Sequence, residues 1–317
     1  MTDSGKEAVT AALNIPAETS LDSGEGRSIK GFLFFVVILL AVFGHSLFSL
    51  ARYAAGQDLH SHILLVPFVS AYLLYIRRKS LPQRYAPSPG WATMPFAAGL
   101  ISILATQALR RSGHSLSEND YLAFIAFSFV CFLTGGGFLF LGRKWMAAAA
   151  FPFAFLIFMV PLPDGVADRL ETASKFASAE AANFFFNITG TPVLRSGTVF
   201  QLPTITIRVA QECSGIRSTL ALLIMTVLAS HMFLKATWKQ LLVCLLAVPL
   251  SIAKNGLRIA TLSALAAYVD PSFLQGRLHQ YGGMFFFAAA FLPLAGLFVL
   301  LQKGETQKTT RSGPVRI

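Results

Sequence analysis

The hydrophobic positions of the chain form long continuous runs, and short polar segments separate these runs from one another. A helix of about 20 apolar residues can cross the roughly 30 Å hydrocarbon core of a bilayer. Most of the runs are about this long, so they predict membrane-spanning helices. The pattern predicts an all-α polytopic membrane protein with about eight spans, at Gly31–Leu50, Ile63–Ile76, Trp91–Leu109, Tyr121–Leu141, Trp145–Leu162, Ile216–Leu234, Gln240–Val269 and Met284–Leu301.

Basic residues are distributed among the loops in a way that predicts the orientation of the spans. Every second loop is rich in lysine and arginine, whereas the loops between them carry acidic residues as well. Loops rich in lysine and arginine remain in the cytoplasm. We expect both termini to be cytoplasmic, with a flexible tail over residues 1–30, a single membrane-embedded domain over 31–302 and a basic tail over 303–317. The basic loops contain Arg77, Arg78, Lys79 and Arg84, then Arg143 and Lys144, then Lys235 and Lys239.

The longest polar segment, 164–213, is predicted to lie outside the membrane on the side opposite the termini. Over Asp164–Asn187, apolar residues recur at helical spacing, which predicts an amphipathic helix on the membrane surface that ends at Gly190. Over Thr204–Gln211, apolar and polar residues alternate strictly, which predicts a strand. We therefore expect Val193–Gln211 to fold into a small β-hairpin or sheet before the sixth span.

The composition agrees with a membrane protein and argues against several other classes. Hydrophobic residues make up 54% of the chain and charged residues 13%, about half of the roughly 25% charged residues of soluble domains. The net charge of +11 does not indicate a nucleic-acid partner, because the basic residues lie in the loops between spans. Three cysteines do not indicate a disulfide scaffold. Two of them, Cys131 and Cys244, lie in apolar runs and are interpreted as packing residues.

The third cysteine, Cys213, lies in the polar stretch VAQECSGIRS (Val209–Ser218) at the outer end of the sixth span. The N-terminus of a helix carries partial positive charge, which favours the thiolate over the thiol. Arg217 follows four residues later and would add positive potential on the same helical face. These neighbours predict a reactive thiol, with an interfacial or lipidated cysteine as the alternative.

Two further residues that can carry chemistry are predicted at the same level of the membrane. Arg258, in the stretch KNGLRIATLS, lies about 27 Å along the seventh span from Gln240 and near its outer end. A charged residue at membrane depth is a functional candidate, and Lys254 lies one turn below it. His279, in GRLHQYGG before the last span, is an acid–base candidate because its charge changes in the physiological pH range. A snorkelling arginine and an interfacial histidine are the alternatives.

The stretch DLHSHILLVP (Asp58–Pro67) is also predicted to face outwards, and it contains two histidines and an aspartate. Residues this close together do not easily supply a full set of ligands, so we expect no metal site here. We expect no other cofactor. We interpret His62 as a residue that lines the active-site cleft.

These stretches resemble motifs of the exosortase/archaeosortase family of membrane transpeptidases. The resemblance spans residues 58–300. Because His279 stands where the archaeal branch has an arginine, the chain is similar to the bacterial exosortases. The stretches that carry the resemblance are VAQECSGIRS at Val209–Ser218, NGLRI at Asn255–Ile259, LHQYGG at Leu278–Gly283, HILLVP at His62–Pro67 and VPLP at Val160–Pro163.

The resemblance implies a cysteine transpeptidase that cleaves the C-terminal sorting signal of exported proteins. Such a signal combines a short Pro-Glu-Pro-like motif, one transmembrane helix and a basic tail. Cys213 would attack a carbonyl group near the motif and form a thioester, Arg258 would stabilise the oxyanion, and His279 would transfer protons. An amine, expected on a lipid of the outer leaflet, would then release the product. The implied location is the bacterial inner membrane, with the active site on the periplasmic face, in a surface-polysaccharide or biofilm pathway.

Substrate-binding residues are expected around these three. The small sheet is expected to bind the extended motif by strand addition, with Arg195, Arg208 or Arg217 meeting its glutamate. Glycines at Gly135–Gly137 and at Gly256 are expected to allow the close approach of helices around a groove for the signal helix. The candidate substrate-binding residues are Arg217, Ser214, His62, Asn255, Arg208 and Glu212.

Two other functions fit a chain of this kind. An intramembrane cysteine protease would use the same residues with water as the acceptor. A transporter would place polar residues near the midplane of several spans, whereas here the polar candidates gather at one surface.

Overall fold

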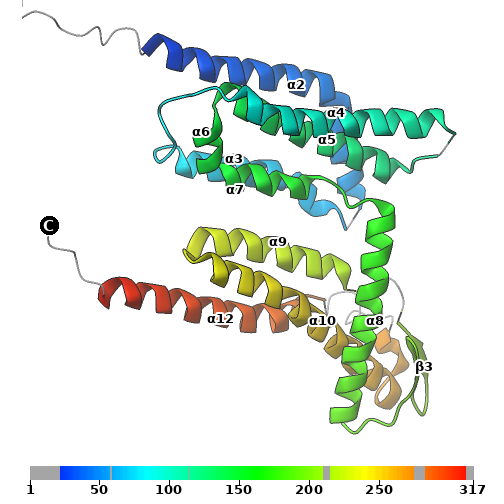
Figure 1. Cartoon of the computed structure of the whole chain (residues 1–317). Helices are drawn as coiled ribbons and strands as arrows, with labels where there is room; N and C mark the ends of the chain where they lie inside the picture. The colour runs from blue at the N-terminus through cyan, green and yellow to red at the C-terminus, as the bar shows by residue number, and fades with distance from the viewer. Residues whose placement is uncertain (1–21, 58, 114, 210–214, 275–282, 312–317) are drawn as a thin grey trace, which may run out of the picture. The chain divides into compact units, whose positions relative to one another are not determined.

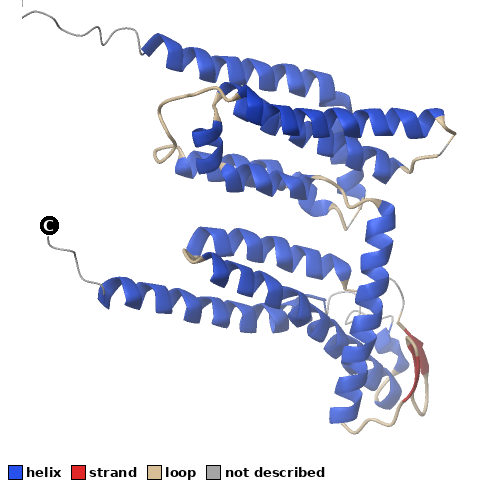
Figure 2. Cartoon of the chain, in the orientation of Figure 1, coloured by secondary structure: helices blue, strands red, loops and turns tan. Residues whose placement is uncertain are grey.

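A computed structural model describes residues 22–57, 59–113, 115–209, 215–274 and 283–311 of the 317-residue chain. These residues are mostly helical, and a small sheet is the other regular structure among them (Figure 2). They cluster into two compact units, one that contains the described residues within 22–56 and 63–161 and the other those within 57–62 and 162–311.

Six of the eight predicted spans are single helices that are long and apolar enough to cross a membrane (Figure 1). This confirms the prediction of an all-α polytopic membrane protein. The first of these helices begins ahead of its apolar run and the last continues beyond it, so both extend into the polar ends of the chain. The six helices are α2 (Asp22–Gly56), α4 (Pro89–Arg111), α5 (Glu118–Phe140), α9 (Ile216–Phe233), α10 (Thr237–Tyr268) and α12 (Gly283–Arg311).

The second predicted span is a short helix. A 3₁₀ turn, η3 (Ser61–Leu64), leads into α3 (Val66–Arg77), which has 12 residues. A helix of this length is about 18 Å long, well below the roughly 30 Å of the hydrocarbon core. Together the two pieces form the apolar segment Ser61–Arg77, which is shorter than the six candidate spans, so the second span stays a prediction.

The fifth predicted span is broken into pieces. It consists of α6 (Arg143–Ala148), α7 (Ala150–Phe155) and the 3₁₀ helix η4 (Leu156–Met159). The chain bends over residues 160–163, between Ala150–Met159 and the next helix, Asp164–Ile188. Pro161 and Pro163 lie at this bend, and proline cannot continue the hydrogen bonding of a helix. The described structure thus has six candidate spans, or seven if the bent pair forms one, and the count of eight stays a prediction.

In the first unit, α5 packs against both α2 and α4. Glycines of α5 lie at these contacts, as the sequence predicted. A side chain at Gly136 would overlap Phe35 of α2, and one at Gly137 would overlap Met146 of α6. The small residues therefore allow large side chains of neighbouring helices to fill the space, rather than leaving a groove at these positions.

In the second unit, α10 is the central helix and packs against α8 (Asp164–Ile188), α9 and α12 (Figure 1). Gly256 lies where α10 crosses α8. A β-carbon at this position would overlap the side chain and backbone of Ala181 and the backbone nitrogen of Ala182. The expected close approach of helices at Gly256 is confirmed, and it brings the following turn of α10 against α8.

The helix and the sheet predicted for the polar segment 164–213 are present in this unit. Helix α8 matches the predicted amphipathic helix, and Gly190 follows it with a φ of +65° that favours glycine. The chain then forms an antiparallel sheet in the order β1-β2-β3. The strands are β1 (Leu194–Ser196), β2 (Val199–Gln201) and β3 (Thr206–Arg208).

The sheet is anchored to the helices by a small apolar core. Phe200 is fully buried and its ring centroid lies 5.4 Å from that of Phe186 on α8. Val209 and the α10 residues Ile259 and Ala260 belong to the same core. The sheet, α8 and the turn of α10 that follows Gly256 are therefore held together as one packed group.

The contact at Gly256 yields a prediction about stability. Gly256→Val should destabilise the second unit by about 1–3 kcal/mol, because the added side chain has no room against the backbone of α8. Thermal unfolding in detergent measures this effect. Gly296→Val on α12 is the matched control, because nothing lies within 4 Å of a β-carbon at Gly296. Equal unfolding temperatures for the two variants would contradict the close approach at Gly256.

Candidate functional site

Polar side chains gather in the second unit, where helix α9 begins beside α10. Helix α9 starts at Ile216, and its N-cap is Gly215 with a φ of +77°. This left-handed conformation favours glycine. A β-carbon at Gly215 would also lie 2.7 Å from Cγ of Asn255 on α10. Glycine is therefore required here by the backbone conformation and by the contact with α10.

Asn255 joins three elements through one buried side chain. It is 2% exposed, its carboxamide packs against Gly215, and its Nδ2 atom donates a hydrogen bond of 2.9 Å to Oγ of Ser178 on α8. A buried amide that loses its partner costs about 1–3 kcal/mol. The side chain therefore fixes the start of α9 relative to both α8 and α10.

Lys254, the neighbour of Asn255, forms a second connection to the same turn of α9. It is 7% exposed and donates a hydrogen bond to Oγ of Ser218. Ser218 has a single hydroxyl hydrogen, which it donates to the carbonyl oxygen of Gly215 at 2.9 Å. The charge of Lys254 is thus connected through Ser218 to the backbone at the N-cap of α9.

A third connection joins the residue that follows Ser218 to α10 one turn before Lys254. Oγ1 of Thr219 donates to the Gly215 carbonyl at 2.9 Å and lies 2.8 Å from Oγ of Ser251. Because the hydroxyl hydrogen of Thr219 is used at Gly215, Ser251 is the donor in the second bond. The first turn of α9 is therefore held against α10 by two hydrogen bonds and by the packing of Asn255 on Gly215.

Arg258 lies at the same end of α10. It follows Asn255 by three residues, which is about 4.5 Å along the helix axis. Its side chain is half-buried, and the next two residues belong to the apolar core under the sheet. Its charge acts on that of Lys254 one turn away. The sequence predicted that Arg258 lies at the same depth in the membrane as the start of the sixth span. The contact between Asn255, one turn before Arg258, and Gly215 agrees with this.

The three arginines predicted to meet a substrate glutamate have different surroundings. Arg208 on β3 and Arg217 in the first turn of α9 are exposed. Arg195 on β1 instead forms an ion pair of 2.7 Å with Glu180 on α8. The hydrogen bond and charge of Arg195 lower the pKa of Glu180. Because its guanidinium group is already engaged, Arg195 is a poorer candidate for substrate contact than Arg208.

The segment 57–62 belongs to the same compact unit as α8. His62 is half-buried, and the neighbouring His60 is 5% exposed. Burial lowers the pKa of His60, as does the charge of His62 to a smaller degree, whereas Asp164 at the start of α8 acts in the opposite direction. The described residues contain no group of three or more His, Cys, Asp or Glu side chains that could hold a metal ion.

Several predicted site residues fall outside the described residues. Both the proposed nucleophile and the proposed proton-transfer residue are among them, so their convergence with Arg258 stays a prediction. One part of the sequence interpretation changes. Helix α9 begins at Ile216, so the same-face relation predicted between residues 213 and 217 does not run along this helix. The residues outside the description are Glu212, Cys213, Ser214 and His279.

The described part of the site also contains residues that sequence reasoning missed. The partners Ser178, Ser218 and Ser251 were not singled out. Serines are common near helix ends, and nothing in the local sequence indicates a contact with a helix many residues away. The sequence contains one signal that such partners exist. A lysine and an asparagine stand side by side within a span, at 254 and 255, and polar residues at membrane depth pair with other groups of the protein.

The comparisons with known proteins agree with the sequence motifs. A family model described as transmembrane exosortase matches residues 53–296, which is most of the chain. A search of curated proteins and a search of solved structures each gave no match. The matched range contains the whole polar site at the start of α9. The chain belongs to the transmembrane exosortase family.

Proposed function

We propose that this protein is a membrane-embedded cysteine transpeptidase that cleaves C-terminal sorting signals, with Cys213 as the nucleophile. The observation that carries the proposal is the polar anchoring of the first turn of α9 beside Arg258. Cys213 precedes Gly215 by two residues, so covalent geometry limits the separation of their Cα atoms to about 7 Å. A nucleophile attached to a fixed turn is restricted in position, which favours attack on a bound carbonyl group.

The reaction proceeds in two stages. The Cys213 thiolate attacks the carbonyl carbon near the Pro-Glu-Pro-like motif, and the guanidinium of Arg258 stabilises the resulting oxyanion. His279 donates a proton to the leaving amine as the C–N bond breaks, which leaves a thioester. His279 then accepts a proton from the incoming amine, whose nitrogen attacks the thioester carbonyl and expels the thiolate. One amide bond is broken and one is formed, and the enzyme returns to its starting state.

The acceptor is an amine, proposed to be on a lipid of the outer leaflet. An active site at the lipid boundary limits access of water to the thioester, which favours aminolysis over hydrolysis. The same residues with water as the acceptor would make a protease. We propose the bacterial inner membrane as the location, with both termini in the cytoplasm and the site on the periplasmic face, in a surface-polysaccharide or biofilm pathway.

Recognition of the extended motif is proposed to use the sheet. β3 is at the edge of the described sheet. In its antiparallel register with β2, the backbone groups of alternate residues point away from β2. The carbonyl oxygen of Ile205 accepts from the backbone N–H of Leu202, and the N–H of Val209 donates to the carbonyl oxygen of Thr198. The backbone groups that point away from β2 therefore belong to Thr206 and Arg208. A motif added along this edge would meet the exposed Arg208 side chain, which supports its role in binding a glutamate.

The role of Cys213 can be tested by substitution. Cys213→Ala should remain in the membrane and abolish processing of a co-expressed protein with a C-terminal sorting signal, because the thioester cannot form. Cys131→Ala and Cys244→Ala are matched controls within the spans α5 and α10 and should process normally. Immunoblotting of substrate size measures the outcome. Normal processing by Cys213→Ala would remove the basis of the proposed function.

The role of Arg258 can be tested by a charge-preserving change. Arg258→Lys should lower the rate of processing by about 10²-fold, because a lysine ammonium does not reproduce the planar donors of a guanidinium at the oxyanion. The rate of substrate loss in isolated membranes is the measurement. A rate equal to that of the unchanged protein would reduce Arg258 to a structural residue.

The positioning role of the α9 contacts can be tested with two serines of the same helix. Ser218→Ala removes the link between Lys254 and the N-cap of α9, and it should lower both processing and the maleimide reactivity of Cys213 by about tenfold, since a hydrogen bond to a charged group contributes about 1.5–3 kcal/mol. Ser230→Ala removes a hydroxyl at the other end of α9. It should leave both rates unchanged.

Maleimide reactivity is the informative readout, because it is measured on folded protein without substrate. If both variants label Cys213 at the rate of the unchanged protein, the contacts do not position the nucleophile, whatever their effect on stability.

A further inference from the structure

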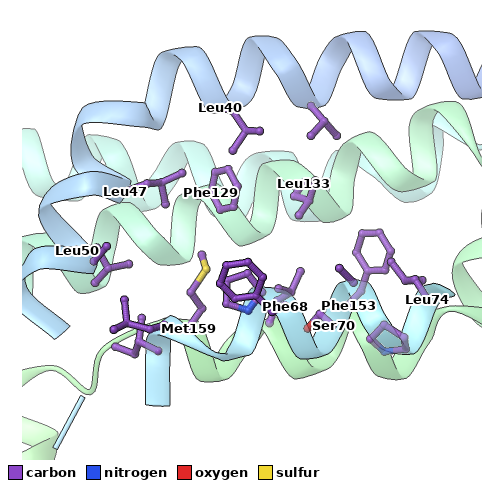
Figure 3. Close-up of a pocket in the computed structure, with 18 of the residues that line it drawn as sticks. Leu40, Leu47, Leu50, Phe68, Ser70, Leu74, Phe129, Leu133, Phe153 and Met159 are labelled. Atoms are coloured by element: carbon purple, nitrogen blue, oxygen red, sulfur yellow. The ribbon is translucent and has the colours of Figure 1, made fainter. Parts of the chain in front are cut away.

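The first unit contains a cavity of about 760 Å³ that the proposed reaction does not use. It lies between α2 and α3, with α5, α7 and η4 as its other walls. Figure 3 shows Leu40 and Leu47 of α2 on one side and Phe68 and Leu74 of α3 on the other. Helix α2 packs on α5, whereas α3 packs on α7 and η4, so the two helices that face each other are supported separately.

Water is not a suitable occupant of this cavity. Among the described residues that line it, Ser70 is the one with a polar side chain. Ser70 is 3% exposed, and its Oγ atom has no hydrogen-bond partner in the described structure. A buried water needs about two to four polar partners, and cavities with apolar walls stay dry. The space therefore suits an apolar group.

The dimensions of the cavity favour a slender occupant over a helix. Phe32 and Ala51, the first and last lining residues on α2, are about 28 Å apart along the helix axis. The volume divided by this length gives a mean cross-section of about 27 Å² for the centre of a water-sized sphere of about 1.4 Å radius, so the walls are about 9 Å apart. An α-helix with its side chains is about 10–12 Å wide. A hydrocarbon chain is narrower, because non-bonded carbon atoms approach to about 3.5–4.0 Å.

The charge at one end of the cavity indicates the type of lipid. Phe32 and Leu74 belong to the same apolar cluster, together with Phe153, so this cluster marks one end. The exposed Arg78 and Lys79 lie four and five residues after Leu74, in the basic loop that begins where α3 ends. Clusters of lysine and arginine next to a membrane span attract anionic lipid headgroups.

We propose that this cavity binds an acyl chain of an anionic phospholipid, whose phosphate group lies against Arg78 and Lys79. The length of the cavity is close to the roughly 30 Å of the hydrocarbon core, so the chain lies along α2 and α3. The acyl chain provides van der Waals contacts that the side chains lining an empty cavity would lack. The lipid holds α2 and α3 together where they do not pack directly. This proposal is independent of the transpeptidase reaction.

The experiment uses the full-length protein in nanodiscs that contain phosphatidylglycerol with a photoactivatable diazirine in its acyl chain. After irradiation, peptides that carry the label are identified by mass spectrometry. Labels are expected on the lining residues of α2 and α3. Ala71→Trp fills the cavity from α3 and should lose most of this labelling. Met94→Trp on the exposed face of α4, which does not line the cavity, is the matched control and should keep it.

A second variant and a competitor keep the test decisive even if Ala71→Trp folds poorly. Arg78→Gln with Lys79→Gln should reduce the labelling by phosphatidylglycerol to the level seen with the corresponding phosphatidylcholine probe. Equal labelling by the two probes in the unchanged protein would overturn the proposed headgroup contact. Loss of labelling on addition of a synthetic apolar helix with a basic tail would assign the cavity to a helix and overturn the proposal. So would equal labelling of the Ala71→Trp and Met94→Trp variants.

Discussion

A polar side chain buried between membrane helices needs a partner within the protein, because no water is present there to replace it. Asn255 and Lys254 impose this constraint on α10, and their partners lie on α8 and α9. Hydrogen bonds between membrane helices contribute about 0.6 kcal/mol each on average. Three such contacts are therefore a small part of the stability of the unit. Their larger effect is on register, since sliding α9 along α10 would leave buried polar groups unpaired at a cost of about 1–3 kcal/mol each.

Close backbone approach at two glycines makes these contacts possible. Gly256 allows α10 to lie directly against α8, and Gly215 allows the start of α9 to pack on Asn255. The apolar core formed by Phe186, Phe200 and Ile259 then attaches the sheet to the same turn of α10. As a result, the polypeptide enters the segment before α9 from a fixed strand and leaves it through a fixed helical turn. Both fixed ends lie next to the turn that carries Arg258.

Much of the fold follows from sequence patterns that are local. Long apolar runs gave six of the helices, and the periodicity of Asp164–Asn187 and of Thr204–Gln211 gave α8 and the strand β3. The second run forms a short helix and the fifth forms several pieces, because an apolar run does not by itself indicate where a helix breaks. Where a helix stops, whether at a proline or after a few turns, depends on how it packs against its neighbours.

The candidate site was less accessible to sequence reasoning. Arg258 and Lys254 were identified because a charge at membrane depth is unusual, and both lie where the described contacts gather. The serines that complete the site are separated from their partners by 32 to 77 residues along the chain. Such pairs leave no local pattern. The cavity between α2 and α3 was not predicted either, because a cavity depends on the packing of several helices.

The most direct test of the account is the distance between Cys213 and position 258. In a background with Cys131→Ser and Cys244→Ser, Arg258→Cys places a second thiol on α10 for reaction with a short bis-maleimide. The account predicts an intramolecular cross-link to Cys213, detected by mass spectrometry of the joined peptides. Leu241→Cys, exposed near the other end of α10, should give none. A cross-link from position 241 and none from position 258 would contradict the claim that the nucleophile and the arginine act at one site.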